Sequence, residues 1–186
     1  MIPASLGWRA GALLSCLLAV GCGAAQSTGA EPSAGGGGPA ASSGARPPDF
    51  ELPTLTGENV RLSDHLGKDV VLIDFWATFC DPCLTAMPHL DELYKKHKSQ
   101  GFLVLGVSID GPDSIAEVKT TVAKLGVSFP ILLDQETRVV SLYNPKTSAP
   151  YSVLIGRDGT VLTKKEGYTT GDATAVDRDV LAALAK

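Results

Sequence analysis

Cysteine and positive charge are both scarce in this sequence. Only four of its 186 residues are cysteine, and two of these, Cys16 and Cys22, lie in the N-terminal segment, which leaves Cys80 and Cys83 for the folded part. Without a second cysteine pair or a closely spaced histidine pair, the further ligands of a zinc site are lacking. Lysine and arginine number 16 against 20 acidic residues, and the formal net charge of -4 excludes the basic footprint of a nucleic-acid-binding protein.

A hydrophobic run long enough to span a membrane comfortably is also lacking. The apolar stretch after Arg9 ends at Cys22, a length typical of a signal peptide. Leu18-Ala19-Val20-Gly21-Cys22 resembles a bacterial lipobox, which implies that residues 1–22 are a lipoprotein-type signal and that Cys22 is lipidated. A similar run ending at Cys16 leaves too few apolar residues after Arg9. An ordinary secretory signal or an uncleaved anchor stays open, and each alternative places the folded part outside the cytoplasm.

Residues 23–45 lack the apolar periodicity that a core requires. They are Gly, Ala and Ser with scattered Pro, a composition that predicts a flexible tether with a reach of about 25 to 30 Å. An unconstrained spacer of no selected length is the alternative. The folded domain is therefore expected at residues 46–186, in a chain that is 44% hydrophobic and long enough for one core.

Beyond residue 46 the sequence predicts strands that alternate with helices. This alternation implies a largely parallel sheet covered on both faces. After Pro150 the pattern changes to an antiparallel hairpin and a closing helix. The expected strands are residues 50–52, 59–62, 70–76, 102–109, 131–133, 151–155 and 160–164, and the expected helices are a single turn at 63–66 and longer segments at 82–97, 114–125, 137–143 and 173–185.

The two cysteines of the folded part lie between a buried strand and a helix, and they give the strongest indication of function. Cysteines two residues apart can close a small disulfide ring in the first turn of a helix. The unpaired N–H groups there stabilise a thiolate, so we predict that Cys80 is the nucleophile. Cys83, one turn further and more sheltered, would resolve the mixed disulfide. Half of a zinc site and a static structural disulfide are the alternatives.

Several motifs together resemble the thioredoxin superfamily and, within it, the TlpA/ResA-type thiol-disulfide oxidoreductases that bacteria anchor outside the cytoplasm. They are Ile73-Asp74-Phe75-Trp76-Ala77 before the cysteines, Pro88 within the helix, Ala149-Pro150, and the hairpin at residues 154–161. The resemblance covers Pro47 to the C-terminus. It implies an α/β thioredoxin-like fold, with a central mixed sheet flanked by helices, an N-terminal hairpin and a TlpA-type insertion between Phe102 and Tyr143.

The resemblance also implies roles for residues near the dithiol. Asp74, on a hydrophobic strand where desolvation raises a carboxyl pKa, would relay a proton to or from Cys83. A partly solvated, hydrogen-bonded core Asp is the alternative. Ala149-Pro150 implies a cis peptide bond and a backbone edge that pairs with substrate polypeptide, whereas an ordinary turn proline would be trans.

Four further residues are expected to shape the surface and the redox properties of the dithiol. Trp76 and Phe79 would line an apolar collar that contacts the substrate, although aromatic residues at such places are often core. Asp81-Pro82 stands where thioredoxin has Gly-Pro, and the acid opposes thiolate formation at Cys80. We therefore expect a higher thiol pKa and a reducing couple. The three histidines, His65, His89 and His97, are widely spaced and receive no catalytic role.

Three functions from different classes remain. The favoured one is a membrane-tethered thiol-disulfide oxidoreductase on the periplasmic side. It would reduce disulfides of partner proteins without a cofactor other than the Cys80–Cys83 pair. Expected partners are extracytoplasmic cysteine-containing proteins, such as apocytochrome c or copper-site proteins, and a membrane thiol electron donor. Residues 144–151 lack the Gly-Val-x-Gly-x-Pro-Glu stretch that cytochrome-maturation reductases often carry, which weakens that particular assignment.

The other two functions are a peroxidase and a binding module. A peroxiredoxin-like thiol peroxidase shares the fold, but it needs a Thr three residues before its cysteine, and Thr78 is only two before Cys80. A nonenzymatic thioredoxin-fold lipoprotein that binds a partner or a metal is the third, and an intact dithiol argues against it.

Overall fold

The computed structural model describes residues 44–186, and its centre is a five-stranded mixed sheet with the order β5-β4-β3-β6-β7. Strand β3 pairs in parallel with β4, and β4 with β5, whereas β6 and β7 are antiparallel. The sheet is thus mixed as predicted, with a parallel half and an antiparallel half formed by the hairpin after Pro150. The strands are β3 (Val70–Trp76), β4 (Phe102–Ser108), β5 (Ile131–Leu133), β6 (Tyr151–Ile155) and β7 (Val161–Glu166).

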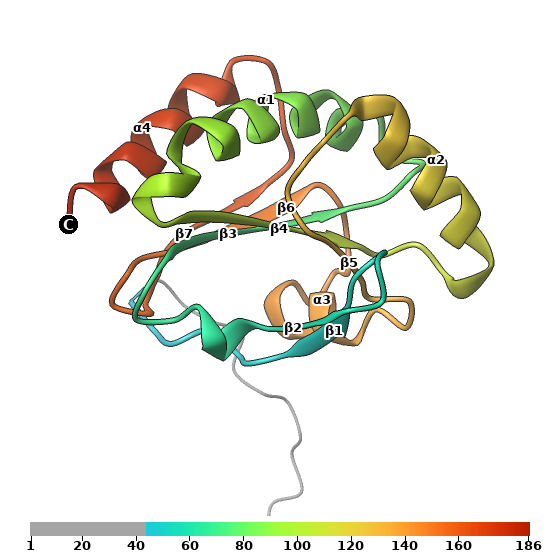
Figure 1. Ribbon diagram of the computed structural model, residues 1–186, viewed down its shortest axis with the longest axis horizontal. Helices are drawn as coiled ribbons and strands as arrows, with labels where there is room; N and C mark the ends of the chain where they lie inside the picture. Colours follow the sequence, from blue (N-terminus) through green and yellow to red (C-terminus); the bar gives the residue numbers. More distant parts are fainter. Residues whose placement is uncertain (1–43) are drawn as a thin grey trace, which may run out of the picture. The chain divides into compact units, whose positions relative to one another are not determined.

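Helices cover both faces of this sheet (Figure 1). On one face lie α1 (Asp81–His97), α2 (Ile115–Leu125) and α4 (Asp172–Leu184). The other face carries the short helix α3 (Arg138–Tyr143) and a small N-terminal hairpin of β1 (Glu51–Pro53) and β2 (Asn59–Arg61). The predicted elements are present, with ends shifted by one or two residues. Three 3-10 turns complete the list, at Leu62–Asp64, Lys98–Gln100 and Pro112–Ser114.

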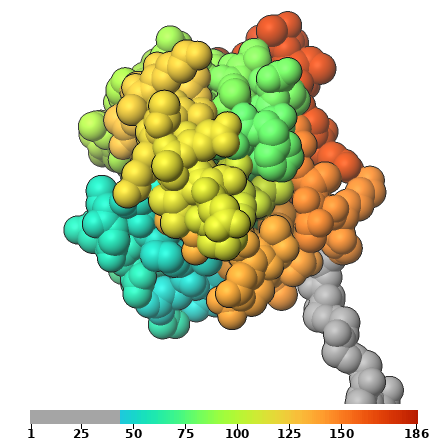
Figure 2. All heavy atoms as spheres, turned by 90° about the vertical axis from the view of Figure 1, so that its right-hand side faces the viewer, coloured from blue at the N-terminus to red at the C-terminus, as the bar shows by residue number. Residues whose placement is uncertain are grey.

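The N-terminal hairpin lies beside the β5 edge of the sheet. Thr54 forms an isolated bridge with Leu132, and the Leu55 N–H donates to the carbonyl of Ile131 at 3.0 Å. Figure 2 shows this edge, where the cyan hairpin and the yellow α2 region lie next to each other. An apolar groove between them is lined by Val60 of the hairpin and Val122 of α2.

The described backbone starts slightly before the expected domain. Gly44 donates its N–H to the Val161 carbonyl at 2.7 Å, and the Val161 N–H donates to Ala45 at 2.9 Å. The predicted signal at residues 1–22, its candidate lipidated Cys22, and residues 23–43 of the predicted linker lie outside the described residues. Within residues 44–186, no helix combines the length and the apolar character needed to cross a membrane.

Strand β3 separates two apolar cores. Every residue of this strand is buried, and successive side chains of a strand point to opposite faces. Leu72 and Trp76 join the core beneath α1, α2 and α4, whereas Ile73 and Phe75 join the core beneath α3 and the N-terminal hairpin. Asp74 lies between Leu72 and Trp76 in the sequence, so it faces the α1 side.

The neighbour of Asp74 on β4 is a glycine with no room for a side chain. Asp74 aligns with Gly106, and Gly106 aligns with Ile131 of β5. A Cβ atom built at Gly106 would lie 2.7 Å from Cε2 of Phe129 and 2.9 Å from Cδ1 of Ile131. The Phe129 ring therefore occupies the space that a β4 side chain would take next to Asp74.

We expect Gly106→Ala to destabilise the fold by about 1–3 kcal/mol, because the added methyl group overpacks this core. Urea unfolding would measure the loss. Gly111→Ala is the matched control, since no atom of the described chain lies within 4 Å of a Cβ at that position. Equal unfolding midpoints for the two variants would contradict the tight packing.

Candidate active site at the start of helix α1

Cys80 and Cys83 form a disulfide at the first turn of α1, with their Cα atoms 5.3 Å apart. Cys80 is the N-cap residue, and its Sγ accepts a hydrogen bond from the Cys83 N–H at 3.3 Å. The exposed fraction is 7% for Cys80 and 0% for Cys83. Only Cys80 thus offers surface to a partner, and the nucleophilic role of Cys80 and the resolving role of Cys83 stay predictions.

The local sequence explains why α1 begins at this point. Pro82 lies in the first turn, where its missing N–H costs nothing. Asp81 is the acidic residue of that turn, and Lys95, Lys96 and His97 lie in the last turn, so the charges complement the helix dipole at both ends. Pro88 lies inside the helix, where the resemblance placed a helix-kinking proline.

Asp74 lies on β3, two residues before the end of that strand. Its side chain is 4% exposed, and its Oδ2 atom has no hydrogen-bond partner among the described residues. Burial raises the pKa of this carboxyl from its ordinary value of 3.8 to about 7. It lines a narrow cavity together with Ala86 and Leu90 of α1, one and two turns beyond Cys83. The unpartnered oxygen differs from the alternative of a hydrogen-bonded core Asp.

Two residues that sequence reasoning missed line the same cavity. Lys165 of β7 and Tyr168 after it share the cavity with Asp74. Lys165 forms an ion pair with Asp172 at the start of α4. Burial raises the pKa of Tyr168, and the charges of Asp172, Asp177 and Asp74 raise it further.

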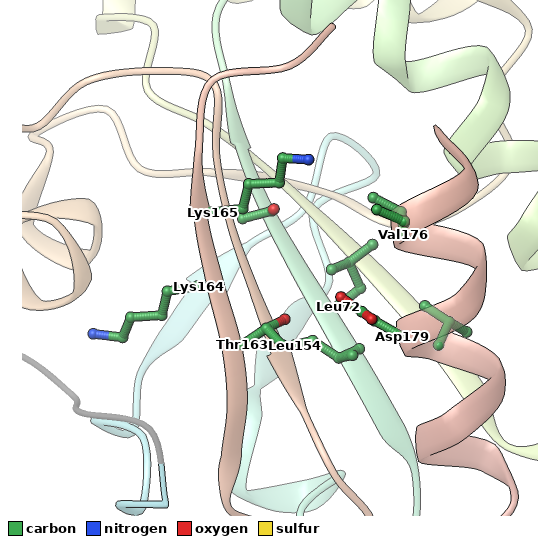
Figure 3. Close-up of a pocket in the computed structure, with 10 residues that line it drawn as sticks. Leu72, Leu154, Thr163, Lys164, Lys165, Val176 and Asp179 are labelled. Carbon is green, nitrogen blue, oxygen red and sulfur yellow. The ribbon is translucent and has the colours of Figure 1, made fainter. Parts of the chain in front are cut away.

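Figure 3 shows the pocket next to the Asp74 cavity, and the two lysines of β7 point in different directions there. Lys165 extends toward α4, whereas Lys164 points away from it. The two-residue periodicity of a strand produces this difference. The sequence contains this periodicity, which could have identified Lys165. Using it required the register between β6 and β7, which pairs Ser152 with Lys165.

The residues predicted to contact substrate are not all at the surface. Phe79 is 78% exposed beside Cys80, whereas Trp76 is 0% exposed. Trp76 packs in the core under the cysteines, so the expectation that it contacts substrate conflicts with its burial. The Ala149–Pro150 peptide bond is cis, as expected, and both residues are half-buried. Pro150 also lines the Asp74 cavity.

A third residue that the sequence reasoning missed, the acid Asp110, holds the loop before Cys80. Asp110 follows β4 and is buried. Its carboxylate accepts hydrogen bonds from the backbone and the hydroxyl of Thr78 and from the Ser108 hydroxyl. Because β3 and β4 are parallel, their carboxyl ends meet at one edge of the sheet. A polar residue just beyond β4 could therefore have been predicted from the sequence to lie near the dithiol.

The histidines pair with neighbours at other places. His89 of α1 lies 3.0 Å from Asp177 of α4, His65 lies 3.1 Å from Asp69, and His97 lies 3.2 Å from Gln100. In the part of the chain from residue 44 onward, no group of three or more His, Cys, Asp or Glu side chains is placed to hold a metal ion.

Residues 43–164 match the model of the AhpC/TSA family. The chain is 39% identical over 118 residues to the thiol-disulfide oxidoreductase ResA of Geobacillus kaustophilus, covering 63% of this chain and 66% of the relative. It is 35% identical over 127 residues to ResA of Bacillus cereus, covering 68% and 71%. The chain thus spans about two thirds of the length of these curated relatives.

A solved structure is similar as well. A chain from Chlorobium tepidum, described as a candidate thiol:disulfide interchange protein DsbE, is 35% identical with a TM-score of 0.72. The match covers 77% of this chain and 99% of that chain. At this identity the likeness extends beyond the fold to sequence relatedness.

The raised pKa of Asp74 predicts a pH-dependent stability. A carboxyl whose pKa is raised in the folded protein costs no stability below its ordinary pKa of 3.8, and the cost grows as the pH rises from there to about 7, above which it is constant. We expect Asp74→Asn to gain stability relative to wild type between about pH 4 and pH 8, by up to about 4 kcal/mol. Urea unfolding at the two pH values would measure this gain.

The matched control is Asp113→Asn, at an exposed aspartate. Its stability relative to wild type should be nearly the same at both pH values. A difference between Asp74→Asn and wild type that does not change with pH would contradict the raised pKa.

Proposed function

Because this chain belongs to the AhpC/TSA family of the thioredoxin superfamily and is a ResA-type thiol-disulfide oxidoreductase, we propose that it reduces disulfides of partner proteins outside the cytoplasm. The observation that carries this proposal is the dithiol at the start of α1. Cys80 is slightly exposed and Cys83 is fully buried, so a partner disulfide can reach only the first sulfur.

The reaction exchanges one disulfide for another. The Cys80 thiolate attacks one sulfur of the partner disulfide, forming a mixed disulfide and releasing the other sulfur as a thiolate. Cys83 then attacks Sγ of Cys80, which releases the second partner thiolate and leaves the Cys80–Cys83 disulfide. Two electrons pass from the protein to the partner, and the described structure corresponds to the oxidised product.

In this mechanism Asp74 accepts the proton that Cys83 loses when it attacks. A carboxyl with a pKa of about 7 can both take up and release a proton near neutral pH. The unpartnered Oδ2 supports this role, since no hydrogen bond within the described chain has to be broken first. The two thiolates released from the partner take up protons from solvent.

The partner surface is proposed to be formed by Phe79 and the Ala149–Pro150 loop. Phe79 offers an exposed apolar ring beside the nucleophile, and a backbone edge at the proline can pair with an extended peptide. Asp81 and Pro82 would adjust the redox properties from the first turn of α1. No cofactor other than the disulfide is required for this exchange.

The proposed location of the domain, and with it the class of its partners, is inferred from the N-terminal sequence. A lipid on Cys22 would tether the domain to a membrane on the periplasmic side, and residues 23–43 would give it reach. Partners would be extracytoplasmic proteins with cysteines, for which apocytochrome c and copper-site proteins are examples. A membrane thiol protein would supply the electrons.

The peroxidase alternative has weaker support. The hydroxyl of Thr78 donates to Asp110 at 2.6 Å, so it is engaged with that carboxylate, and Thr78 stands at the wrong spacing from Cys80. The binding-module alternative leaves the dithiol without a use.

The two cysteines should differ in their loss of function. We expect Cys80→Ser to abolish reduction of insulin disulfides, because no nucleophile remains. Cys83→Ser should also stop turnover but should retain attack, so that it accumulates a mixed disulfide on Cys80. Mass spectrometry of the trapped complex from cell extracts would identify the natural partner. Unchanged insulin reduction in both single variants would reject the proposed function.

The negative charge of Asp81 should make the couple reducing. We expect a reduction potential below that of glutathione, and a more oxidising potential in Asp81→Asn, since removing the acid stabilises the thiolate and thus the reduced form. Equilibration with glutathione buffers would measure both. Glu92→Gln, an exposed acid further along α1, is the matched control. A wild-type potential more oxidising than that of glutathione would overturn the reducing direction.

A further inference from the structure

We propose that Asp110 is a positioning residue for Cys80, holding the turn of residues 77–80 in the geometry that places the nucleophile at the start of α1. This inference rests on the proposed function, because it assigns a role within the same site. Asp110 lies 30 positions beyond the nucleophile in the sequence, in the segment that connects β4 to α2.

The contacts of Asp110 converge on one residue of the turn. Its Oδ1 atom accepts from the Thr78 N–H at 3.1 Å and from the Thr78 hydroxyl at 2.6 Å. Its Oδ2 atom lies 3.2 Å from the same N–H and accepts from the Ser108 hydroxyl at 2.8 Å. Ser108 in turn accepts from the Asp110 N–H at 3.2 Å. The carboxylate is 4% exposed, so these bonds are shielded from water.

The turn itself has few other supports. The Cys80 N–H donates to the Ala77 carbonyl at 3.1 Å, which closes the turn, and the Ile109 N–H donates to the Trp76 carbonyl at 2.9 Å, which ends the β3–β4 ladder. Thr78 lies between these two points, outside both β3 and α1. The Asp110 carboxylate is the only acceptor found for its N–H in the described part of the chain.

This support matters because a helix terminus acts over a short range. The stabilisation of a thiolate by unpaired N–H groups falls off within the first turn of the helix. The 3.3 Å hydrogen bond from the Cys83 N–H to the Cys80 sulfur depends on where residue 80 sits. A turn that loses its anchor at Thr78 moves Cys80 relative to these donors, so that less of the thiol ionises at neutral pH.

The chain contains a matched example of the same contact without a dithiol. Asp91 of α1 is also 4% exposed, and it accepts from the N–H of Ser128 at 2.6 Å and from its hydroxyl at 2.8 Å. This pair attaches α1 to the segment before β5, about 12 Å along the helix from Cys83. Removing Asp91 therefore costs a similar set of buried hydrogen bonds at a distance from the nucleophile.

The test measures the pH profile of iodoacetamide alkylation in the full-length protein carrying Cys83→Ala, read by mass spectrometry on the peptide that contains Cys80 so that Cys16 and Cys22 do not contribute. With Asp110→Ala we expect the profile to move to higher pH and the rate at neutral pH to fall about tenfold. Asp91→Ala should keep the reference profile even where its thermal unfolding midpoint falls as far. Iodoacetamide needs no partner protein. The alkylation profile therefore tests the role of Asp110 even if the insulin assay rejects the proposed function.

A charge effect has the opposite sign. Loss of a nearby negative charge alone would favour the thiolate and move the profile to lower pH. Asp110→Asn keeps a carbonyl oxygen for the Thr78 N–H and removes the charge, so its profile should lie at the reference pH or below it. If Asp110→Ala also moves the profile downward, or leaves it unchanged, the positioning role is rejected.

A milder variant keeps the test decisive if Asp110→Ala fails to fold. Thr78→Val removes only the hydroxyl hydrogen bond at 2.6 Å and leaves the backbone contact in place. It should slow alkylation at neutral pH by about threefold, in the same direction. A rate equal to that of the reference protein would count against the proposal.

Discussion

The complete burial of β3 is the constraint on which the geometry of the active site depends. All seven residues of this strand are buried, and it pairs with β4 on one edge and β6 on the other. A slip of one residue would move every apolar side chain to the opposite layer, so the register is firmly specified. Its last residue, Trp76, therefore fixes where the chain leaves the sheet, and four residues later Cys80 begins α1.

The same buried sheet positions two acids whose carboxyl groups differ in their hydrogen bonding. Asp74 projects from the middle of β3 into an apolar layer, where one oxygen has no partner within residues 44–186 and burial raises its pKa to about 7. Asp110 lies at the end of β4, where its carboxylate accepts hydrogen bonds from Thr78 and Ser108. An isolated buried carboxyl is free to exchange a proton, whereas one that is fully bonded serves to hold structure. A dithiol needs both, because it must move protons without moving its nucleophile.

Much of the fold could be predicted because it depends on local patterns. The apolar run at residues 70–76, the turn signals around Gly159 and the proline after Cys80 each specify an element without help from the rest of the chain. The change of pattern after Pro150 likewise predicted the β6–β7 hairpin, which adds the two antiparallel pairings of the mixed sheet. The sequence left Trp76 either in a collar around the dithiol or in the core, and strand alternation turns its ring into the core beneath α1.

The sequence by itself determined the dithiol, the buried acid behind it and the proline loop, because each is encoded by residues close together in the chain. Only the tertiary structure decided which distant residues join them. Asp110 and Lys165 come to the site through the pairing of β3 with β4 and of β6 with β7, and no local pattern carries that pairing. Strand order and register arise from the burial of whole faces at once. The carboxylate that binds Thr78 and the lysine that shares the cavity of Asp74 therefore become visible only when the sheet is assembled.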